Sequence, residues 1–158
     1  IGKAKVDALH DLVKDFTDTA IKPVNRRYEG GAFGGIVISA VDRMDVRELL
    51  WTNIKNFGYN TRSYIDARMA SEYALLYVMN PKCEIDQAKY QSTLHTDENA
   101  VQERCTAKAT MFTVNMIAGL IAKSVKDILV GGNCPYEVQW AINNNHFVNY
   151  PKGEADDQ

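Results

Sequence analysis

The sequence predicts an α/β fold with a Rossmann-like, mostly parallel sheet and flanking helices, and three observations indicate it. A continuous apolar run over residues 36–41 is typical of a strand buried on both faces of a parallel sheet. A helical pattern over 46–57 follows this run and is closed by Gly58. Two strand-like stretches, 61–65 and 72–79, come next, and the order strand–helix–strand is that of a parallel unit.

The chain before this unit begins with a helix. Apolar residues recur at helical spacing over 4–17, which predicts an amphipathic helix. Residues 21–28 have the composition of a short strand, and Pro23 places it near a sheet edge. The glycine-rich stretch 30–35 is expected to be a loop. It is not a dinucleotide-binding fingerprint, because its glycine spacing differs and it precedes a strand instead of following one.

The chain after this unit begins with a polar excursion over 81–102, of a kind that often serves function. Residues 106–129 are expected to form a long helix, which is apolar nearly all round from 111 to 122 and should therefore be buried. Residues 137–142 and 146–150 flank three asparagines, which suit a turn with positive φ, and so predict a final antiparallel hairpin.

Bulk composition is that of one globular domain over residues 1–150, followed by an acidic tail, 151–158, that we expect to be flexible. A net charge of −2 argues against a nucleic-acid binder or a polybasic membrane binder. The longest apolar run is too short to span a bilayer, and three scattered cysteines suggest a reducing cytoplasm. Because the sequence begins at Ile1, inside a helical pattern, we expect it to be a fragment of a longer protein.

Two side chains near strand and helix ends are candidate site residues, each with an alternative interpretation. Asp42 directly follows the predicted buried strand, where a carboxylate can hold Mg²⁺ against nucleotide phosphates. Its spacing alone favours a simpler role, in which it caps the following helix and Asp45 completes a capping box. Cys105 begins the long helix, whose N-terminus favours a thiolate, although a buried and inert cysteine is the commoner outcome.

Three further residues carry less information. Lys5, at the start of the first helix, would by itself be a solvated lysine. Asp66 and Arg68 either form a site at a strand end or simply belong to a turn. The cysteines form no CxxC pair and the histidines show no ligand spacing, so we expect no zinc site.

The order of these segments resembles the later portion of a domain of the ThiF/MoeB and ubiquitin-activating enzyme superfamily (HesA/MoeB/ThiF). The segment Gly2-Lys-Ala-Lys5-Val-Asp is similar to the family's G-x-x-K-V/A-E, and residues 21–25 are similar to its next strand. Residues 37–47 resemble its hydrophobic strand that ends in an aspartate, with an arginine, here Arg47, five residues later. Glu103-Arg-Cys105-Thr-Ala resembles the stretch where many members keep a cysteine. The likeness covers residues 1–142.

The resemblance implies an adenylyltransferase. In the family, the residue matching Lys5 contacts ATP phosphates and the one matching Asp42 works with Mg²⁺. The cysteine matching Cys105 forms, in some members, a thioester or persulfide link with the carrier protein. The complete protein would adenylate the C-terminal carboxylate of a ubiquitin-like or sulfur-carrier protein and would act as a homodimer.

The sequence departs from the family pattern in three ways that bear on the expected activity. Arg43 stands where the family commonly has asparagine, and the cysteine pairs that bind zinc in many bacterial members are missing. The glycine-rich nucleotide loop would lie upstream of Ile1, so we expect the chain alone to bind ATP poorly or not at all. The missing loop and Arg43 favour an alternative, a non-catalytic α/β interaction module, whereas the retained Lys5, Asp42 and Cys105 disfavour it. A Rossmann oxidoreductase fragment is a weaker alternative, because nothing resembles a substrate-side acid–base pair.

Overall fold

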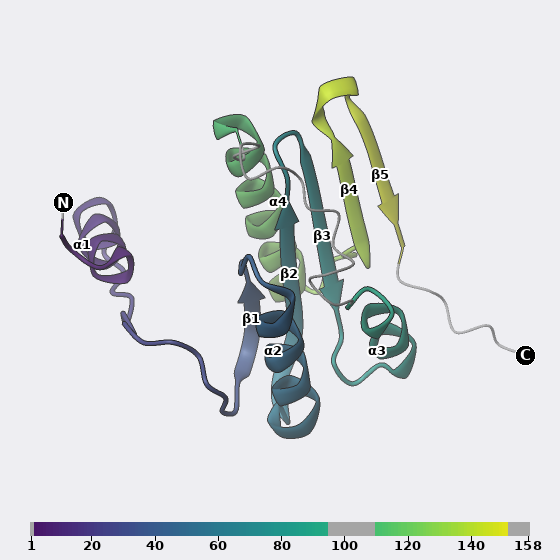
Figure 1. Cartoon of the computed structure of the whole chain (residues 1–158), viewed down its shortest axis with the longest axis horizontal. Helices are drawn as coiled ribbons and strands as arrows, with labels where there is room; N and C mark the ends of the chain where they lie inside the picture. The colour runs from purple at the N-terminus through teal and green to yellow at the C-terminus, as the bar shows by residue number, and fades with distance from the viewer. Residues whose placement is uncertain (1, 95–109, 152–158) are drawn as a thin grey trace, which may run out of the picture.

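The computed structural model describes residues 2–94 and 110–151 as an α/β fold with an open, mixed five-stranded sheet (Figure 1). The strands are β1 (Gly34–Ser39), β2 (Asn60–Met69), β3 (Tyr73–Met79), β4 (Glu137–Ala141) and β5 (His146–Tyr150). The helices are α1 (Lys5–Phe16), α2 (Met44–Phe57), α3 (Glu84–Gln91) and α4 (Met111–Val130), with a short 3₁₀ turn at Ile142–Asn144.

The five strands lie in the sheet in the order of the chain. β1 and β2 are parallel and are joined through α2, as a parallel pair requires. All later neighbours are antiparallel, so the prediction of a mostly parallel sheet is wrong. The physical reason lies in the connection from β2 to β3, because residues 70–72 are too few for a crossover and can only form a hairpin.

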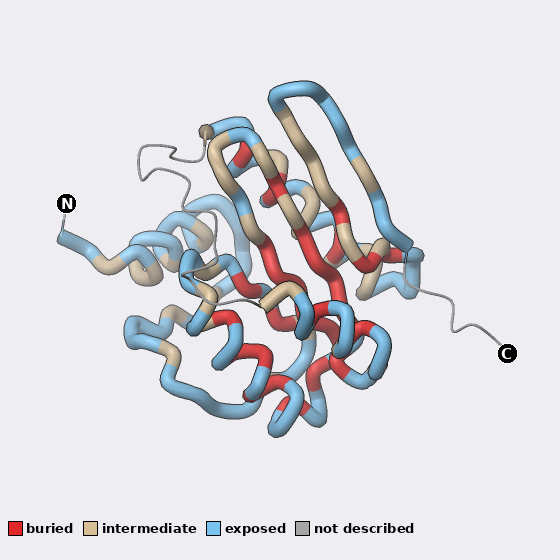
Figure 2. Tube along the Cα trace, turned by 45° about the vertical axis from the view of Figure 1, so that its right-hand side comes forward, coloured by how far each residue is buried: buried red, intermediate tan, exposed pale blue. Residues whose placement is uncertain are grey.

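Helices cover both faces of the sheet (Figure 1). α2 and α3 pack on one face, where Trp51 and Tyr90 join the buried side chains of the strands, and α4 packs on the other through Ile117. Figure 2 shows that the buried residues concentrate along β2 and β3, at the centre of the sheet. The core is therefore two layers of apolar side chains separated by the sheet.

Aromatic rings dominate the layer under α2 and α3. Trp51 is fully buried and stacks on Tyr64, with ring centroids 5.7 Å apart. Tyr90 meets Trp51 edge to face at 4.9 Å. Such large side chains bury much apolar area, and their contacts fix α2 and α3 against β2.

α4 has capped ends and only one buried face. Thr110 caps its N-terminus by accepting a hydrogen bond from the Thr113 amide, and Gly131 ends it in the left-handed conformation (φ 71°). The predicted burial on all sides over 111–122 is wrong, since Met111 and Phe112 are 79% and 46% exposed. The predicted start at residue 106 lies outside the described residues.

β1 is the edge of the described sheet and not a strand buried on both faces, because Ile38 is 48% exposed. Residues 17–33 connect it to α1 without regular structure, so the predicted strand over 21–28 is wrong. α1 has the predicted extent but contains no buried residue, and Figure 1 shows it standing beyond the β1 edge. The predicted hairpin near the C-terminus is confirmed as β4 and β5, with Asn145 at φ 53°.

Candidate functional site

A cleft of about 880 Å³ lies beyond the C-terminal end of β1. Four segments line it: the start of α1 with Lys5, the connection at 27–29, the residues 40–43 that follow β1, and the first turns of α2. The carboxyl ends of parallel strands are where open α/β sheets bind ligands. Lys5 and Asp42, which are 37 positions apart in the numbering of the chain, thus share one cleft.

Asp42 carries a free carboxylate in this cleft. Its residue is exposed, and within the described parts of the chain its side chain has neither a hydrogen bond nor an ion pair. The interpretation of Asp42 as the cap of α2 is wrong, because Arg43 is the N-cap residue and no side chain caps this helix. A carboxylate that no donor among the described residues engages is available to bind a cation.

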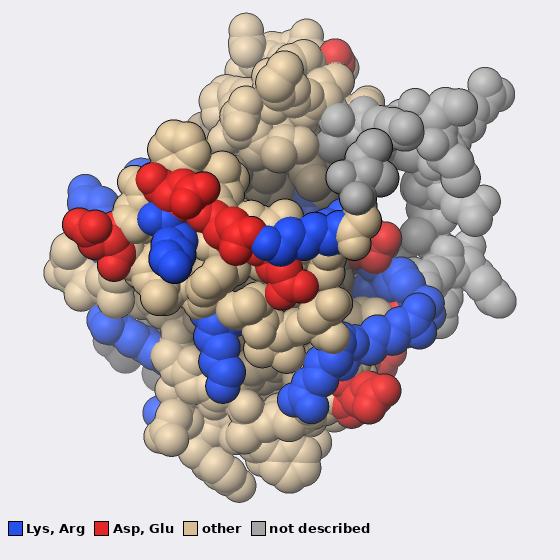
Figure 3. All heavy atoms as spheres, turned by 90° about the vertical axis from the view of Figure 1, so that its left-hand side faces the viewer, with Lys and Arg blue, Asp and Glu red and all other residues tan. Residues whose placement is uncertain are grey.

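The neighbouring Asp45, in contrast, is engaged within its own helix turn. Its Oδ1 accepts hydrogen bonds from Arg43 Nε at 2.9 Å and from the Val46 amide at 2.7 Å. These bonds lower the pKa of Asp45, the bond from the Arg43 side chain being the largest cause. Charged side chains of both signs are interspersed on the side of the molecule that carries α1 (Figure 3).

Asp66 is the centre of a buried ion cluster behind the cleft. Its carboxylate is fully buried and accepts hydrogen bonds from Arg47 Nε at 3.1 Å, Arg68 Nε at 2.7 Å and the Tyr90 hydroxyl at 3.1 Å. These partners come from α2, β2 and α3. The two interpretations of Asp66 and Arg68, as a strand-end site or a turn, are corrected: both lie within β2, which runs unbroken from Asn60 to Met69.

Arg47 links this cluster to the loop that carries Asp42. Its Nη2 donates to the carbonyl of Val41 and, at 3.3 Å, to that of Ala67. The Val41 carbonyl precedes Asp42 directly in the chain, so the ion cluster holds the backbone from which that carboxylate projects. Arg47 and Asp66 therefore hold the loop that carries Asp42 against β2.

Arg68 reaches in the opposite direction, toward the end of α3. Its Nη1 and Nη2 donate to the carbonyl and hydroxyl of Thr93 at 3.2 and 2.9 Å. The guanidinium also lies over the ring of Tyr77, 4.9 Å from its centroid. Burial opposes the charge of Arg68, but the neighbouring Asp66 favours it, and the pKa of Arg68 is raised on balance.

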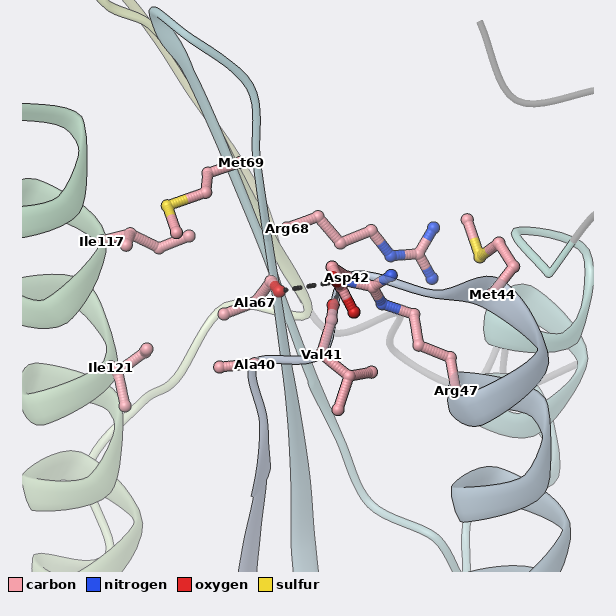
Figure 4. Close-up of a pocket in the computed structure, with 10 residues that line it drawn as sticks. All are labelled: Ala40, Val41, Asp42, Met44, Arg47, Ala67, Arg68, Met69, Ile117 and Ile121. Carbon is pink, nitrogen blue, oxygen red and sulfur yellow. Dashed lines mark hydrogen bonds between the residues drawn. The ribbon is translucent and has the colours of Figure 1, made fainter. Parts of the chain in front are cut away.

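A second, smaller pocket of about 330 Å³ adjoins the cleft and shares residues 40–42 with it. Figure 4 shows its two sides: Met69, Ile117 and Ile121 form an apolar wall toward α4, and Arg47 and Arg68 lie toward α2. The two spaces thus meet at residues 40–42.

Cys105, the candidate nucleophile, lies outside the described residues. Of the other two cysteines, Cys83 is partly exposed and Cys134 is buried. In the ranges 2–94 and 110–151, no three His, Cys, Asp or Glu side chains gather in a group that could hold a metal ion by themselves. Nor does this part of the chain contain a helix of the length and apolarity needed to cross a bilayer.

Sequence reasoning missed several residues of the site. Arg27 and Glu29 line the cleft, although Arg27 belongs to the segment 21–28 that was predicted to be an edge strand and Glu29 directly follows it. Their charged run just before a glycine pair was the available signal, because charges beside glycines favour a loop over a strand. Tyr90 and Thr93 carried no signal, since their roles depend on a guanidinium from another element.

Comparison of the sequence with known protein families and with curated proteins yields no match.

Proposed function

We propose that the chain is part of a ThiF-type adenylyltransferase and that its cleft holds the phosphates of ATP. The observation that carries the proposal is the free carboxylate of Asp42 in one cleft with Lys5, at the carboxyl end of a parallel strand. The resemblance assigns these same two residues to the nucleotide. The protein is proposed to work in the cytoplasm, as a homodimer, on a ubiquitin-like or sulfur-carrier protein.

A free carboxylate such as that of Asp42 fits Mg²⁺ bound together with a nucleotide, and the carboxylate of Glu29, which has no hydrogen bond or ion pair among the described residues, lines the same cleft. This ion usually keeps several waters and takes one or two protein carboxylates, with substrate phosphates as further ligands. Asp42 would be that carboxylate, and Asp45 is not a second one because Arg43 and the Val46 amide already engage it. The ion would supply neutralising charge between the phosphates.

The residues of the chain then act by position and charge. Lys5 would place an ammonium, a mobile point charge, toward the phosphates. Arg47 would keep Asp42 in place through the Val41 carbonyl. In the reaction, a carboxylate oxygen of the carrier attacks the α-phosphorus, the bond from that phosphorus to the bridging oxygen breaks, and pyrophosphate leaves with the electron pair. The products are an acyl-adenylate and pyrophosphate, and preorganised charge lowers the barrier.

Binding of Mg-ATP tests the nucleotide part directly in the protein expressed from its whole reading frame. Asp42→Asn should weaken the binding of ATP in the presence of Mg²⁺ about tenfold or more, as the loss of a contact to a charged group worth about 1.5–3 kcal/mol implies. It should leave Mg²⁺-free binding nearly unchanged, whereas Lys5→Gln should weaken both. Glu48→Gln, on an exposed position of α2, and Lys14→Gln, on α1, are the matched controls.

ATP–pyrophosphate exchange with the carrier protein as carboxylate donor tests the chemistry. We expect Asp42→Ala to abolish exchange. If exchange persists unaltered in this variant, or if the Mg²⁺ dependence of ATP binding does, Asp42 does not have the proposed role.

Exposed apolar side chains favour a second candidate, a non-catalytic interaction module. Leu9, Leu12 and Phe16 on α1 are 51%, 53% and 80% exposed. Apolar groups at this exposure on one helix commonly mark a contact surface. A protein from the whole reading frame that neither binds Mg-ATP nor supports exchange would favour the module over the enzyme.

A further inference from the structure

The outer side of α4 carries apolar and small side chains at a regular spacing. α4 packs on β2 and β3 through the side that holds Ile117, on the face of the sheet opposite α2 and α3 (Figure 1). On its outer side, positions 111, 115, 118, 122, 125 and 129 follow one another at alternating steps of four and three residues. This heptad spacing is typical of a helix that pairs with another helix.

The side chains at these positions are open, although most of them are apolar. Met111 and Leu129, at the two ends of the helix, are 79% and 63% exposed. Asn115, Ala118 and Ala122, between them, are exposed as well. A helix that is apolar nearly all round is normally buried on all sides. α4 is buried on its inner side only, so its outer side is a candidate contact surface.

The order of the residues along this outer side is complementary to its own reverse. A second copy of α4 can lie antiparallel to the first, with the two helices closest near Leu120. The opposed residues are then Met111 and Leu129, Asn115 and Val125, and Ala118 and Ala122. Large apolar side chains thus meet at both ends of the contact. The alanines at its centre let the two helix axes approach closely.

The charges on α4 are compatible with an antiparallel pair. Lys123 forms an ion pair with Asp127 of its own helix, one turn away. Lys126 lies beside the heptad positions, and the antiparallel pair brings it next to Phe112 of the second copy, a residue that is 46% exposed. An ammonium group is attracted to the face of an aromatic ring. Each helix N-terminus also lies near the C-terminus of the other helix, where the two dipoles attract.

We propose that the outer side of α4 is the contact surface of a symmetric dimer, in which a second copy of this chain pairs its α4 antiparallel to the first. A twofold axis passes near Leu120, so each contact occurs twice. One pair of helices is a small interface, and we expect a dissociation constant in the micromolar range. The resemblance implies a homodimer but assigns no surface to it, whereas this proposal rests on the exposed residues of α4.

Sedimentation velocity of the protein expressed from its whole reading frame, at about 1 to 200 µM, measures the association. We expect a monomer–dimer equilibrium whose dissociation constant Ala122→Glu raises at least tenfold, because this substitution places a carboxylate at the centre of the contact. Position 122 faces water in the monomer, so the midpoint of urea unfolding should change little. Ala8→Glu, at an exposed alanine of α1, is the matched control. A parent protein that stays monomeric over this range, or a dimer that Ala122→Glu leaves unchanged, overturns the proposal.

Disulfide cross-linking tests the antiparallel order. The variants Met111→Cys and Leu129→Cys are prepared separately, mixed and oxidised, and the parent protein is the control for its own cysteines. The antiparallel pair predicts a cross-linked dimer in the mixture and no cross-link above the parent level in either variant alone. Cross-linking of one variant with itself would indicate a parallel pair, and a mixture without a cross-link would indicate another surface. Either result overturns the proposal.

This proposal and the proposed function can fail separately. Neither Ala122 nor Met111 lines the cleft, so Ala122→Glu should leave Mg-ATP binding intact. A protein that binds Mg-ATP but shows no cross-link in the mixture contradicts only the dimer through α4. A protein that forms this dimer but binds no Mg-ATP contradicts only the proposed function.

Discussion

Replacement of Asp66 by asparagine should be among the most destabilising substitutions of similar size in this protein. The change keeps the shape of the side chain but removes the charge that Arg47 Nε and Arg68 Nε contact at 3.1 and 2.7 Å. The side chains of both arginines are largely buried, with relative exposures of 7% and 14%, so each would keep a charge without its partner. Removing one member of a buried ion pair costs about 3–5 kcal/mol, a large part of the roughly 5–15 kcal/mol that stabilises a domain.

Urea unfolding measured by tryptophan fluorescence checks this value, because Trp51 is fully buried against Tyr64. For a denaturant slope of about 2 kcal/mol per molar, the midpoint should fall by roughly 2 M. Glu48→Gln, on the exposed side of α2, should stay within about 0.5 kcal/mol of the parent protein.

A double-mutant cycle with Arg47→Met separates the unpaired charge from other effects. In the Asp66→Asn background, Arg47→Met should cost at least about 1 kcal/mol less than it does alone, because it removes the stranded guanidinium. The reasoning would be refuted if Asp66→Asn changed the free energy of unfolding by less than about 1 kcal/mol, or if the two substitutions were additive.

Two further predictions concern glycine and tyrosine. A Cβ at Gly58 would lie 2.4 Å from the Ile54 carbonyl oxygen and 2.8 Å from Thr61 Oγ1, so Gly58→Ala should cost about 1–3 kcal/mol in urea unfolding. A Cβ at Gly119, inside α4, would meet no other atom within 4 Å, so Gly119→Ala should stabilise the protein by about 0.5–1 kcal/mol. If both substitutions changed the free energy of unfolding in the same direction, the packing described for the two glycines would be contradicted. Burial raises the pKa of Tyr64 to about 12, above that of an unfolded tyrosine. The contribution of Tyr64 to stability should therefore be intact below about pH 10 and fall by about 1.4 kcal/mol per pH unit as the pH approaches the folded pKa. The pKa values of Tyr77, Tyr90 and Tyr136 are raised as well, so the total fall should be steeper. Urea midpoints measured across this pH range check the prediction, with tyrosinate absorbance as the monitor of ionisation. Midpoints that stay constant would contradict a buried Tyr64 hydroxyl.

The helices α1, α2 and α4 and the final hairpin could be predicted from local patterns. The helix α3 could not, because it lies in the polar stretch 81–102, which was predicted only as an excursion. α1 and α2 follow the 3.6-residue spacing of apolar side chains, and Gly58 marks the end of α2 in both sequence and structure. The prediction placed a break between two strands at the polar residues 66–68, because strand patterns assume that polar residues face water. Here the carboxylate of Asp66 is neutralised by arginines from α2 and from β2 itself, so β2 continues through it.

The smaller pocket could not be foreseen from the sequence. It exists because β1 ends at Ser39 while its neighbour continues for three residues, and the relative length of paired strands is a property of the sheet. The parallel or antiparallel sense of the strands was likewise decided by the short connection at 70–72, which left no room for a crossover.

By itself, the sequence determined the class of fold, the places of α1, α2 and α4, and the choice of Lys5 and Asp42 as candidate site residues. Local periodicity and residue type carry that information. Only the tertiary structure decided that these two side chains share a cleft and that the carboxylate of Asp42 is free of the helix it precedes. Such facts depend on contacts between residues far apart in the chain. The support of Asp42 by Arg47 and Asp66 arises in the same way, since it appears only when α2 packs against β2.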